Sequence, residues 1–287
     1  MRKMDKIRDV YKQEKELLRL AMQQSFLKEE EEPIYNRVLE GMEHGAVLDI
    51  GCNDGTRTVD RFGTDRVSKV IGVEYHRELA DRANSNHGGG KFHFYQADAE
   101  SSGFEDSLEN IMEIFGIEGF DIINISFVLM HLKDPGKLLS RMKNFLKPGG
   151  TLTSVETDDR FSRMLPDKEG RMKQFLEFCR KDMLSGRRRL GGDVPDMLEL
   201  CGYQDVLVHS RCISASASEK NRKEQMFEIA FSWLLEDFEQ MCRIYPENQE
   251  YARIKTEIAE NYEKFRIDFT EKSTEVSCGL VMVTGVR

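Results

Sequence analysis

Short apolar runs alternate with segments of helical periodicity through the middle of the chain. Each run has the length of a buried strand, and the segments between them repeat apolar residues every three or four positions. This alternation predicts an α/β fold, a doubly wound and mostly parallel sheet with helices on both faces. The predicted strands are 46–51, 69–74, 91–95, 120–126 and 150–156, and the helices between them are 55–62, 76–85, 104–116 and 134–146.

The pattern before the first strand is different. Residues 5–28 carry apolar side chains at helical spacing, which predicts an amphipathic helix within an N-terminal helical cap, residues 1–43. The acidic run Glu29 to Glu32 and the following Pro33 predict a solvated linker or the start of another helix.

Two further strands, around 206–208 and 279–283, would complete a seven-stranded sheet. About sixty residues separate them, and this stretch is helical in pattern. One helix is predicted to carry Met226 to Met241, and a second runs from Asn248 to Asp268. The predicted organisation is therefore a core at 44–218, a helical insertion at 219–270 and the last core strand within 271–287. The insertion is interpreted as a lid that forms an acceptor pocket or as a dimerisation arm.

The first strand leads into the most informative segment of the chain. It ends in a turn that holds Gly51, Asn53 and Gly55, and Glu74 closes the second strand nineteen residues after Gly55. That spacing fits one helical crossover. It is typical of the nucleoside-binding half of a doubly wound sheet, where ligands lie at the carboxyl ends of the strands.

The residues of this turn distinguish between two classes of nucleoside ligand. A dinucleotide turn has glycine at its first, third and sixth positions, which here are Gly51, Asn53 and Thr56. Asp49 would also repel a diphosphate, whereas it suits a ligand with an ammonium or sulfonium group, such as S-adenosylmethionine (SAM). Glu74 can accept both ribose hydroxyls in either case. The pattern favours SAM, and a dehydrogenase is the last alternative.

At these residues the chain resembles the class I SAM-dependent methyltransferases. Their first motif, an acid followed by glycine at every second position, is matched by Asp49, Gly51, Asn53 and Gly55. Asn53 replaces the middle glycine, a position that asparagine tolerates because it enters positive φ more readily than most residues. The resemblance covers residues 44–157 closely, and further segments follow in the family's order at 95–99, 120–126, 129–132 and 146–150.

The resemblance implies SAM as cofactor, with S-adenosylhomocysteine (SAH) as product, and a set of cofactor-binding residues. Asp98 would meet the adenine amino group, although an aspartate here could instead cap the helix that begins near residue 104. Cys52 is interpreted as a small buried residue rather than a reactive thiol. The implied residues are Asp49, Gly51, Cys52, Asn53, Gly55, Glu74, Tyr75, Asp98, Ala99, Ser126 and Phe127.

Methyl transfer from SAM requires little chemical catalysis by the protein, because aligning the two reactants and excluding water suffice for many acceptors. A base helps only where the acceptor must lose a proton. His131 follows the fourth strand and is the candidate catalytic base, with packing beside the cofactor as the alternative.

Two charged clusters later in the chain have an ordinary and a functional interpretation. Glu156, Asp158 and Asp159 could meet a cationic amine or a metal, but acids in a loop more often cap and face solvent, and no metal is expected. The run 187–189 of arginines could clamp an anionic acceptor, and a solvated helix flank is the favoured interpretation.

The amino-acid composition limits the partners and the cellular location that fit this chain. The chain has 287 residues, 39% of them hydrophobic, and a formal net charge of -9, which argues against a nucleic-acid partner. No apolar stretch approaches a membrane span or a signal peptide, and the six cysteines are scattered, so a cytoplasmic location without membrane attachment is expected.

The sequence therefore predicts a SAM-dependent methyltransferase that modifies an oxygen or nitrogen atom of a small-molecule acceptor. The alternatives are a SAM-binding or sensing module without turnover, and a methyltransferase acting on tRNA or protein. A homodimer is compatible with the helical insertion.

Overall fold

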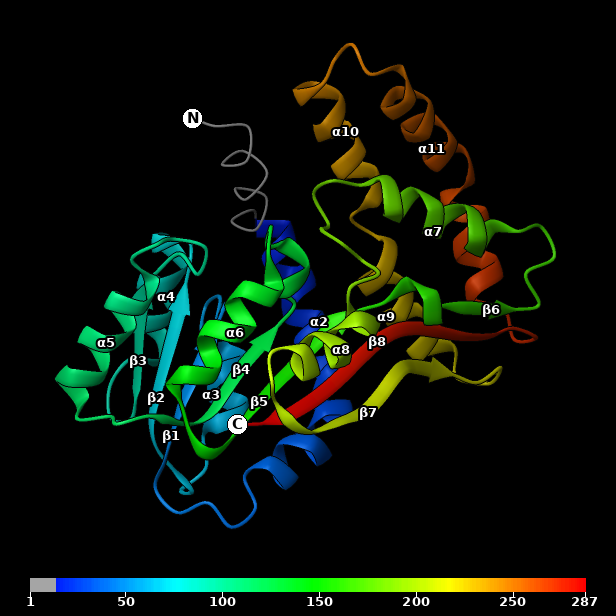
Figure 1. Ribbon diagram of the computed structural model, residues 1–287. Helices are drawn as coiled ribbons and strands as arrows, with labels where there is room; N and C mark the ends of the chain where they lie inside the picture. The colour runs from blue at the N-terminus through cyan, green and yellow to red at the C-terminus, as the bar shows by residue number, and fades with distance from the viewer. Residues whose placement is uncertain (1–13) are drawn as a thin grey trace. The chain divides into compact units, whose positions relative to one another are not determined.

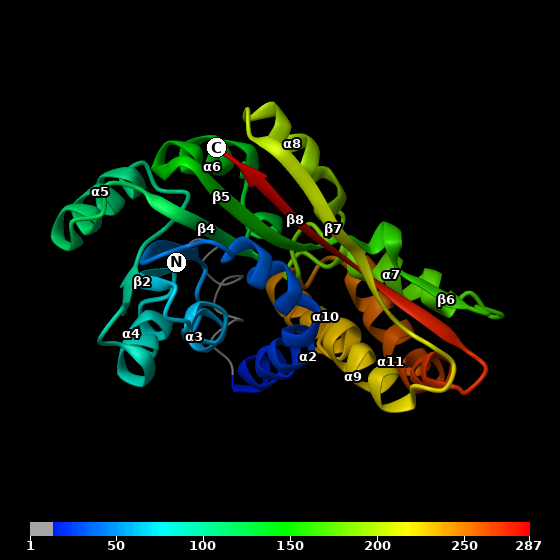
Figure 2. The same ribbon diagram turned by 90° about the horizontal axis from the view of Figure 1, so that it is seen from below.

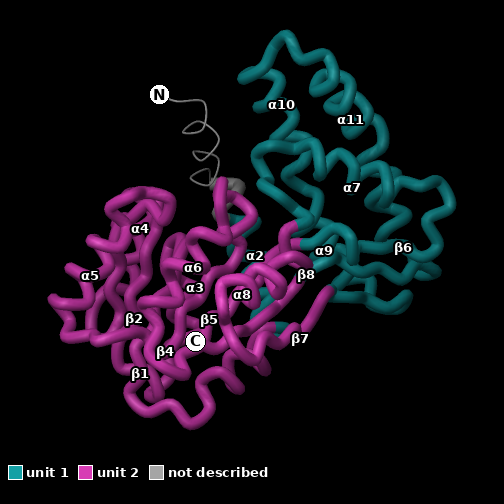
Figure 3. Tube along the Cα trace, in the orientation of Figure 1, with its two compact units in different colours: residues 1–30, 158–189, 212–280 teal, residues 31–157, 190–211, 281–287 magenta. Residues whose placement is uncertain are grey.

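The computed structural model describes residues 14–287, with side chains from Leu18 onward. These residues form two compact units (Figure 3). Unit 1 contains the chain up to Glu30, together with 158–189 and 212–280, and unit 2 contains 31–157, 190–211 and 281–287. Residues 5–13 of the predicted N-terminal helix lie outside the described part.

The predicted doubly wound sheet is confirmed (Figure 1). The strand order is β3-β2-β1-β4-β5-β8-β6, with β7 paired to β8, and β1 to β5 pair in parallel. An eighth strand, β6, was not predicted; it has only three residues and pairs antiparallel with β8, too short for a period to show. The strands are β1 (Gly45–Ile50), β2 (Val67–Glu74), β3 (Phe92–Gln96), β4 (Phe120–Ser126), β5 (Leu146–Thr157), β6 (Arg163–Leu165), β7 (Gln204–Ala215) and β8 (Glu275–Val286).

Helices cover both faces of the sheet in unit 2 (Figure 2). Side chains alternate along β1, so that Leu48 and Ile50 join one core while Val47 joins the other. The first core is closed by α5 (Phe104–Phe115), α6 (Pro135–Phe145) and α8 (Val194–Leu200), and the opposite face by α3 (Thr56–Phe62), α4 (Arg77–His87) and the end of α2 (Glu14–Val38).

The prediction of a linker at the acidic run was wrong, because α2 continues through Pro33 to Val38. Glu31 is buried there and forms ion pairs with Arg57 and Arg61 of α3. Proline inside a helix removes one backbone hydrogen bond. In α2 the buried ion pairs and the burial of Tyr35 offset that loss.

Unit 1 has an aromatic core of its own. The rings of Phe175 and Phe265 have centroids 4.3 Å apart, and Phe227 lies 5.2 Å from Phe265. Phe231 and Phe269 complete the cluster, and all of these side chains are fully buried. The contributing helices are α7 (Arg171–Lys181), α9 (Lys220–Phe231) and α11 (Gln249–Thr270), with α10 (Leu234–Ile244) packed beside α11.

Two sequence expectations change in unit 1. The single helix predicted through Met226 to Met241 is interrupted at Ser232 and Trp233, so it forms α9 and α10. Its apolar residues stay in register across the break, which is why periodicity alone did not reveal it. Helix α7 was not predicted, and it contributes to the same core as the insertion.

The described chain also contains single turns of 3₁₀ helix. They are η2 (Leu129–His131), η3 (Asp159–Phe161) and η4 (Gly191–Asp193). Among residues 14–287, every helix is too short or too polar to cross a lipid bilayer.

Candidate functional site

The turn after β1 has the backbone that its sequence predicted. Gly51, Asn53 and Gly55 have φ values of 75°, 51° and 81°, so every second residue is left-handed. A Cβ on Gly51 would lie 2.2 Å from Cγ2 of Val128, and one on Gly55 would lie 2.8 Å from the Phe94 ring. Asn53 occupies the position where the family has its middle glycine, and the prediction that asparagine would adopt positive φ is confirmed.

Glu74 ends β2 beside this turn, because Ile50 and Val73 are paired in the sheet. The residue is 8% exposed, and its two carboxylate oxygens accept the backbone N–H groups of Asn53 at 3.1 Å and His76 at 3.0 Å. Burial raises the pKa of Glu74 above its ordinary value, although these N–H groups oppose the shift. Each oxygen keeps acceptor capacity for a further hydroxyl group.

Asp49 lies in the interior and is 3% exposed. Its Oδ2 accepts the hydroxyl of Thr58 at 2.5 Å, and its Oδ1 accepts the side-chain amide of Asn124 at 2.6 Å. The carboxylate therefore joins β1 to α3 and β4. Its contact with a cationic ligand stays a prediction.

Asn124 is the centre of this hydrogen-bond network and was not singled out in the sequence. Its Oδ1 accepts hydroxyl groups from Tyr35 at 2.7 Å and Thr153 at 2.8 Å. A polar residue inside the apolar run of β4 was the available signal, because fully buried amides are rare without partners. Thr58, Tyr35 and Thr153 gave no such signal.

The third strand brings Asp98 to the same edge of the sheet. Its Oδ1 accepts the N–H of Glu100 at 2.9 Å, so it organises the loop after β3. It does not cap the next helix, since α5 begins at Phe104 after Gly103. The neighbouring Ala99 offers its carbonyl to Arg141 at 3.2 Å.

Two further predicted cofactor residues, Cys52 and Tyr75, lie beside Glu74. Cys52 is buried, which confirms its interpretation as a packing residue, and burial raises the pKa of its thiol well above the ordinary value. Tyr75 packs its ring edge-on against His76, with ring centroids 4.9 Å apart.

The segment after β4 carries Ser126, Phe127 and His131. Ser126 pairs in register with Val155, and Phe127 has a φ of 56°, which turns the chain out of the sheet. His131 ends the single turn η2 and is half-buried. The structure thus places the candidate base on the loop that follows β4, as the sequence indicated.

Glu156 holds this turn. The residue is 1% exposed, and its carboxylate accepts backbone N–H groups from Val128 at 3.0 Å, Leu129 at 2.8 Å and Met130 at 3.4 Å. These three contacts are those of a cap, as the ordinary interpretation of these acids expected.

The other charged residues singled out in the sequence, Asp158, Asp159 and the arginines at 187–189, belong to unit 1. Asp158 pairs with Arg160, and Asp159 forms two hydrogen bonds with Arg188 at 2.8 and 2.9 Å. The Arg188 side chain is 10% exposed, so the favoured interpretation of the arginine run as a solvated flank was wrong for this residue. Among the residues that the structure describes, no three His, Cys, Asp or Glu side chains gather as a metal site.

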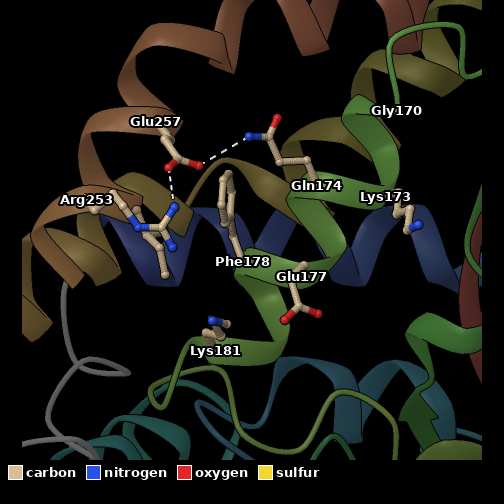
Figure 4. Close-up of a pocket in the computed structure, with 9 residues that line it drawn as sticks. Gly170, Lys173, Gln174, Glu177, Phe178, Lys181, Arg253 and Glu257 are labelled. Atoms are coloured by element: carbon tan, nitrogen blue, oxygen red, sulfur yellow. Dashed lines mark hydrogen bonds and ion pairs between the residues drawn. The ribbon is translucent and has the colours of Figure 1, made fainter. Parts of the chain in front are cut away.

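Unit 1 also contains a groove of about 360 Å³ between α7 and α11 (Figure 4). Glu257 lies between Arg253, with which it forms an ion pair, and Gln174, which donates a hydrogen bond at 3.3 Å. Phe178 and Ile254 also line the groove. None of the predicted site residues lines this groove.

The strand order reverses between β1 and β4, and the turn at Gly51 to Gly55, Glu74, Asp98 and Phe127 lie at or just after the carboxyl ends of β1 to β4. A left-handed turn and a buried glutamate at that position define the class of nucleoside-binding doubly wound folds. The residues fit a SAM-type nucleoside, because Glu74 has acceptor capacity for ribose hydroxyls and the Gly51 and Gly55 positions have no room for a Cβ.

Comparison with known proteins identifies the family within this class. A family described as a methyltransferase domain matches residues 42–230, and the chain belongs to it. The predicted resemblance to class I SAM-dependent methyltransferases is thereby confirmed, and SAM is the cofactor of that class.

The sequence relatives match less than half of the chain. UbiE of Vibrio campbellii, a ubiquinone/menaquinone biosynthesis C-methyltransferase, is 34% identical over 122 residues, which are 37% of this chain. An uncharacterized methyltransferase of Schizosaccharomyces pombe is 34% identical over 120 residues. The chain spans 43% and 40% of the length of these two relatives.

Solved structures match over most of the chain. YcgJ of Bacillus subtilis has a TM-score of 0.52 at 16% identity, covering 89% of this chain and 97% of its own. Phosphoethanolamine N-methyltransferase 2 of Haemonchus contortus, crystallised with SAM, has a TM-score of 0.51 at 16% identity, covering 90% of this chain and 52% of its own. At these identities the likeness is one of fold.

Proposed function

We propose that this protein is a SAM-dependent methyltransferase that acts on a small-molecule acceptor, with an oxygen or nitrogen atom as the methyl acceptor. The observation that supports this most is the pairing of the left-handed turn at Gly51, Asn53 and Gly55 with the buried carboxylate of Glu74. Glu74 would accept the ribose hydroxyls, and Asp98 would face the adenine. The net charge of -9 disfavours a nucleic-acid acceptor.

Bound SAM would supply an activated methyl group on its sulfonium. The protein's part is to orient the two reactants and to exclude water. Glu156 fixes the turn that carries His131 through three backbone hydrogen bonds. In that position His131 would take the proton from a hydroxyl or an ammonium acceptor.

A carbon acceptor is the second candidate, because relatives over 122 residues are named C-methyltransferases. A SAM-binding module without turnover is the alternative of a different class. Titration of the purified chain with SAM, SAH and NAD separates the cofactor classes. Turnover is then measured as SAH formed from methyl-labelled SAM in the presence of a metabolite extract. Binding without SAH formation would favour the sensing module, and binding of NAD alone would overturn the proposal.

His131→Gln should lower turnover roughly 10²- to 10⁴-fold while SAM affinity stays unchanged, because the imidazole would act on the acceptor and not on the cofactor. The acceptor found in the extract is used for this measurement. Equal turnover in both proteins would remove His131 from the chemistry and favour an acceptor that needs no base.

Glu74 gives the cofactor site a predictable pH dependence. Its raised pKa means that the neutral form persists in the folded protein above the ordinary titration range of a glutamate. The stabilisation from that neutral form is complete below the ordinary pKa and is lost as the pH rises through the folded-state pKa. Ribose hydroxyls bind the ionised carboxylate best, so SAM affinity should increase over the same rise.

Titrations between about pH 5 and about pH 8 test this on the wild-type protein and on Glu74→Gln. At the upper end of this pH range, Glu74→Gln should bind SAM about 10- to 100-fold more weakly than the wild-type protein does. At the lower end, the two affinities should be nearly equal. Parallel pH profiles for the two proteins would contradict the assignment of Glu74.

A further inference from the structure

Arg57 lies in the first turn of α3, directly after the left-handed turn. Its guanidinium group is 5.5 Å from the centroid of the Phe127 ring, within the range of a cation–π contact. It thereby spans from the loop after β1 to the residue after β4. Both of these loops belong to the predicted cofactor site.

Arg57 has hydrogen-bonding capacity left over. A guanidinium group has five N–H donors. Within residues 14–287, the Arg57 side chain donates one hydrogen bond, from Nη2 to Oε1 of Glu31. The other oxygen of Glu31 is taken by Arg61, whose Nε and Nη2 lie 3.1 and 2.8 Å away.

Two guanidinium groups share the single carboxylate of Glu31, so Glu31 alone leaves one positive charge in excess. Arg61 is enclosed, with 7% of its side chain exposed and its guanidinium 4.8 Å from the centroid of the Tyr35 ring. Arg57 keeps 18% of its side chain exposed. The accessible part of this excess charge is therefore on Arg57.

The predicted cofactor site is otherwise rich in acids, with Asp49, Glu74 and Asp98 at the ends of neighbouring strands. The amino-acid end of SAM carries a carboxylate as well as an ammonium group. A carboxylate brought among these acids is repelled unless a cation meets it.

Resting on the proposed function, we infer that Arg57 binds the carboxylate of the cofactor's amino-acid end and that Glu31 is its positioning residue. Phe127 supports the flat face of the guanidinium, and Glu31 anchors Nη2. This arrangement leaves N–H groups for a charge-assisted pair with the ligand. It also gives the end of α2 a part in cofactor recognition.

Glu31 is suited to this positioning task because it is ionised. Burial alone would raise its pKa, but Arg57 and Arg61 outweigh that effect and lower it. The anchor is thus present at and above the ordinary pKa of a glutamate, and it is lost only as the pH falls through the lowered folded-state value.

Two ligands that differ only at the amino-acid end test the inference. SAH carries the carboxylate, whereas 5′-methylthioadenosine has the same adenosine and thioether without it. Arg57→Gln should weaken SAH binding about 10- to 100-fold in calorimetric titration of the full chain and leave 5′-methylthioadenosine within about twofold. Arg57→Lys, which keeps the charge, should restore part of the SAH affinity.

Arg61→Gln is the matched control, because Arg61 pairs with the same carboxylate but is enclosed. It should lower the melting temperature and leave the affinity ratio of the two ligands unchanged. Glu31→Gln should lower SAH affinity less than Arg57→Gln does.

Unchanged SAH affinity in Arg57→Gln, or an equal loss for both ligands, would overturn the inference while leaving the proposed function intact. A wild-type protein that binds neither ligand would overturn the proposed function and this inference with it.

Discussion

Gly51→Ala is expected to abolish measurable SAM binding and to lower the free energy of unfolding by about 3 kcal/mol. The added Cβ would lie 2.2 Å from Cγ2 of Val128, so the Val128 side chain, the turn or the loop after β4 must shift. Those two segments carry the predicted cofactor residues Asn53 and Phe127, and a shift of either one displaces the site. Calorimetric titration measures the first effect, and chemical denaturation measures the second.

Gly149→Ala is the matched control for this variant. Gly149 has a φ of 78°, close to the 75° of Gly51, but nothing lies within 4 Å of its added Cβ. It should therefore show the strain of a left-handed alanine alone, about 1 kcal/mol, with SAM affinity unchanged. Equal losses of stability in the two variants would mean that the contact with Val128 has no effect.

Asn124→Leu is expected to destabilise the protein by about 4 kcal/mol, because it leaves three buried groups without their partner. Asp49 Oδ1 loses its amide donor, and the hydroxyl groups of Tyr35 and Thr153 lose their acceptor. Leucine has the same branching as asparagine and is larger, so the loss does not come from a cavity. Denaturant titration with a constant m-value would measure it.

Thr153→Val provides the comparison within the same network. It removes one hydroxyl donor and leaves the Asp49–Asn124 hydrogen bond in place, so a loss of about 1 kcal/mol is expected. If Asn124→Leu costs no more than Thr153→Val, the buried carboxylate of Asp49 does not depend on the amide.

The geometry of the turn after β1 and the position of Glu74 were predictable because their determinants are local in the chain. The left-handed positions of Gly51, Asn53 and Gly55 follow from backbone sterics, which a sequence displays directly. The position of Glu74 follows from the length of one crossover between parallel strands.

The partners of these residues were not predictable, because they come from distant segments. Glu31 is separated by 26 positions from Arg57, and Tyr35 is separated by 89 from Asn124. An acidic run next to a proline favours a solvated linker on composition alone. Two arginines on α3 decide that this run is buried in α2. The periodicity of the run itself does not reveal them.

The amino-acid sequence by itself determined the alternation of strands and helices, the turn geometry and the class of nucleoside bound, since each depends on residues close together in the chain. The tertiary structure decided which charges are paired. The Glu156 carboxylate accepts hydrogen bonds from the turn that carries His131, and Asp159 pairs with Arg188. Glu31 pairs with Arg57 and leaves it N–H groups that can bind a ligand. Pairing depends on burial and on distances across the fold, and these exist only once the chain has folded.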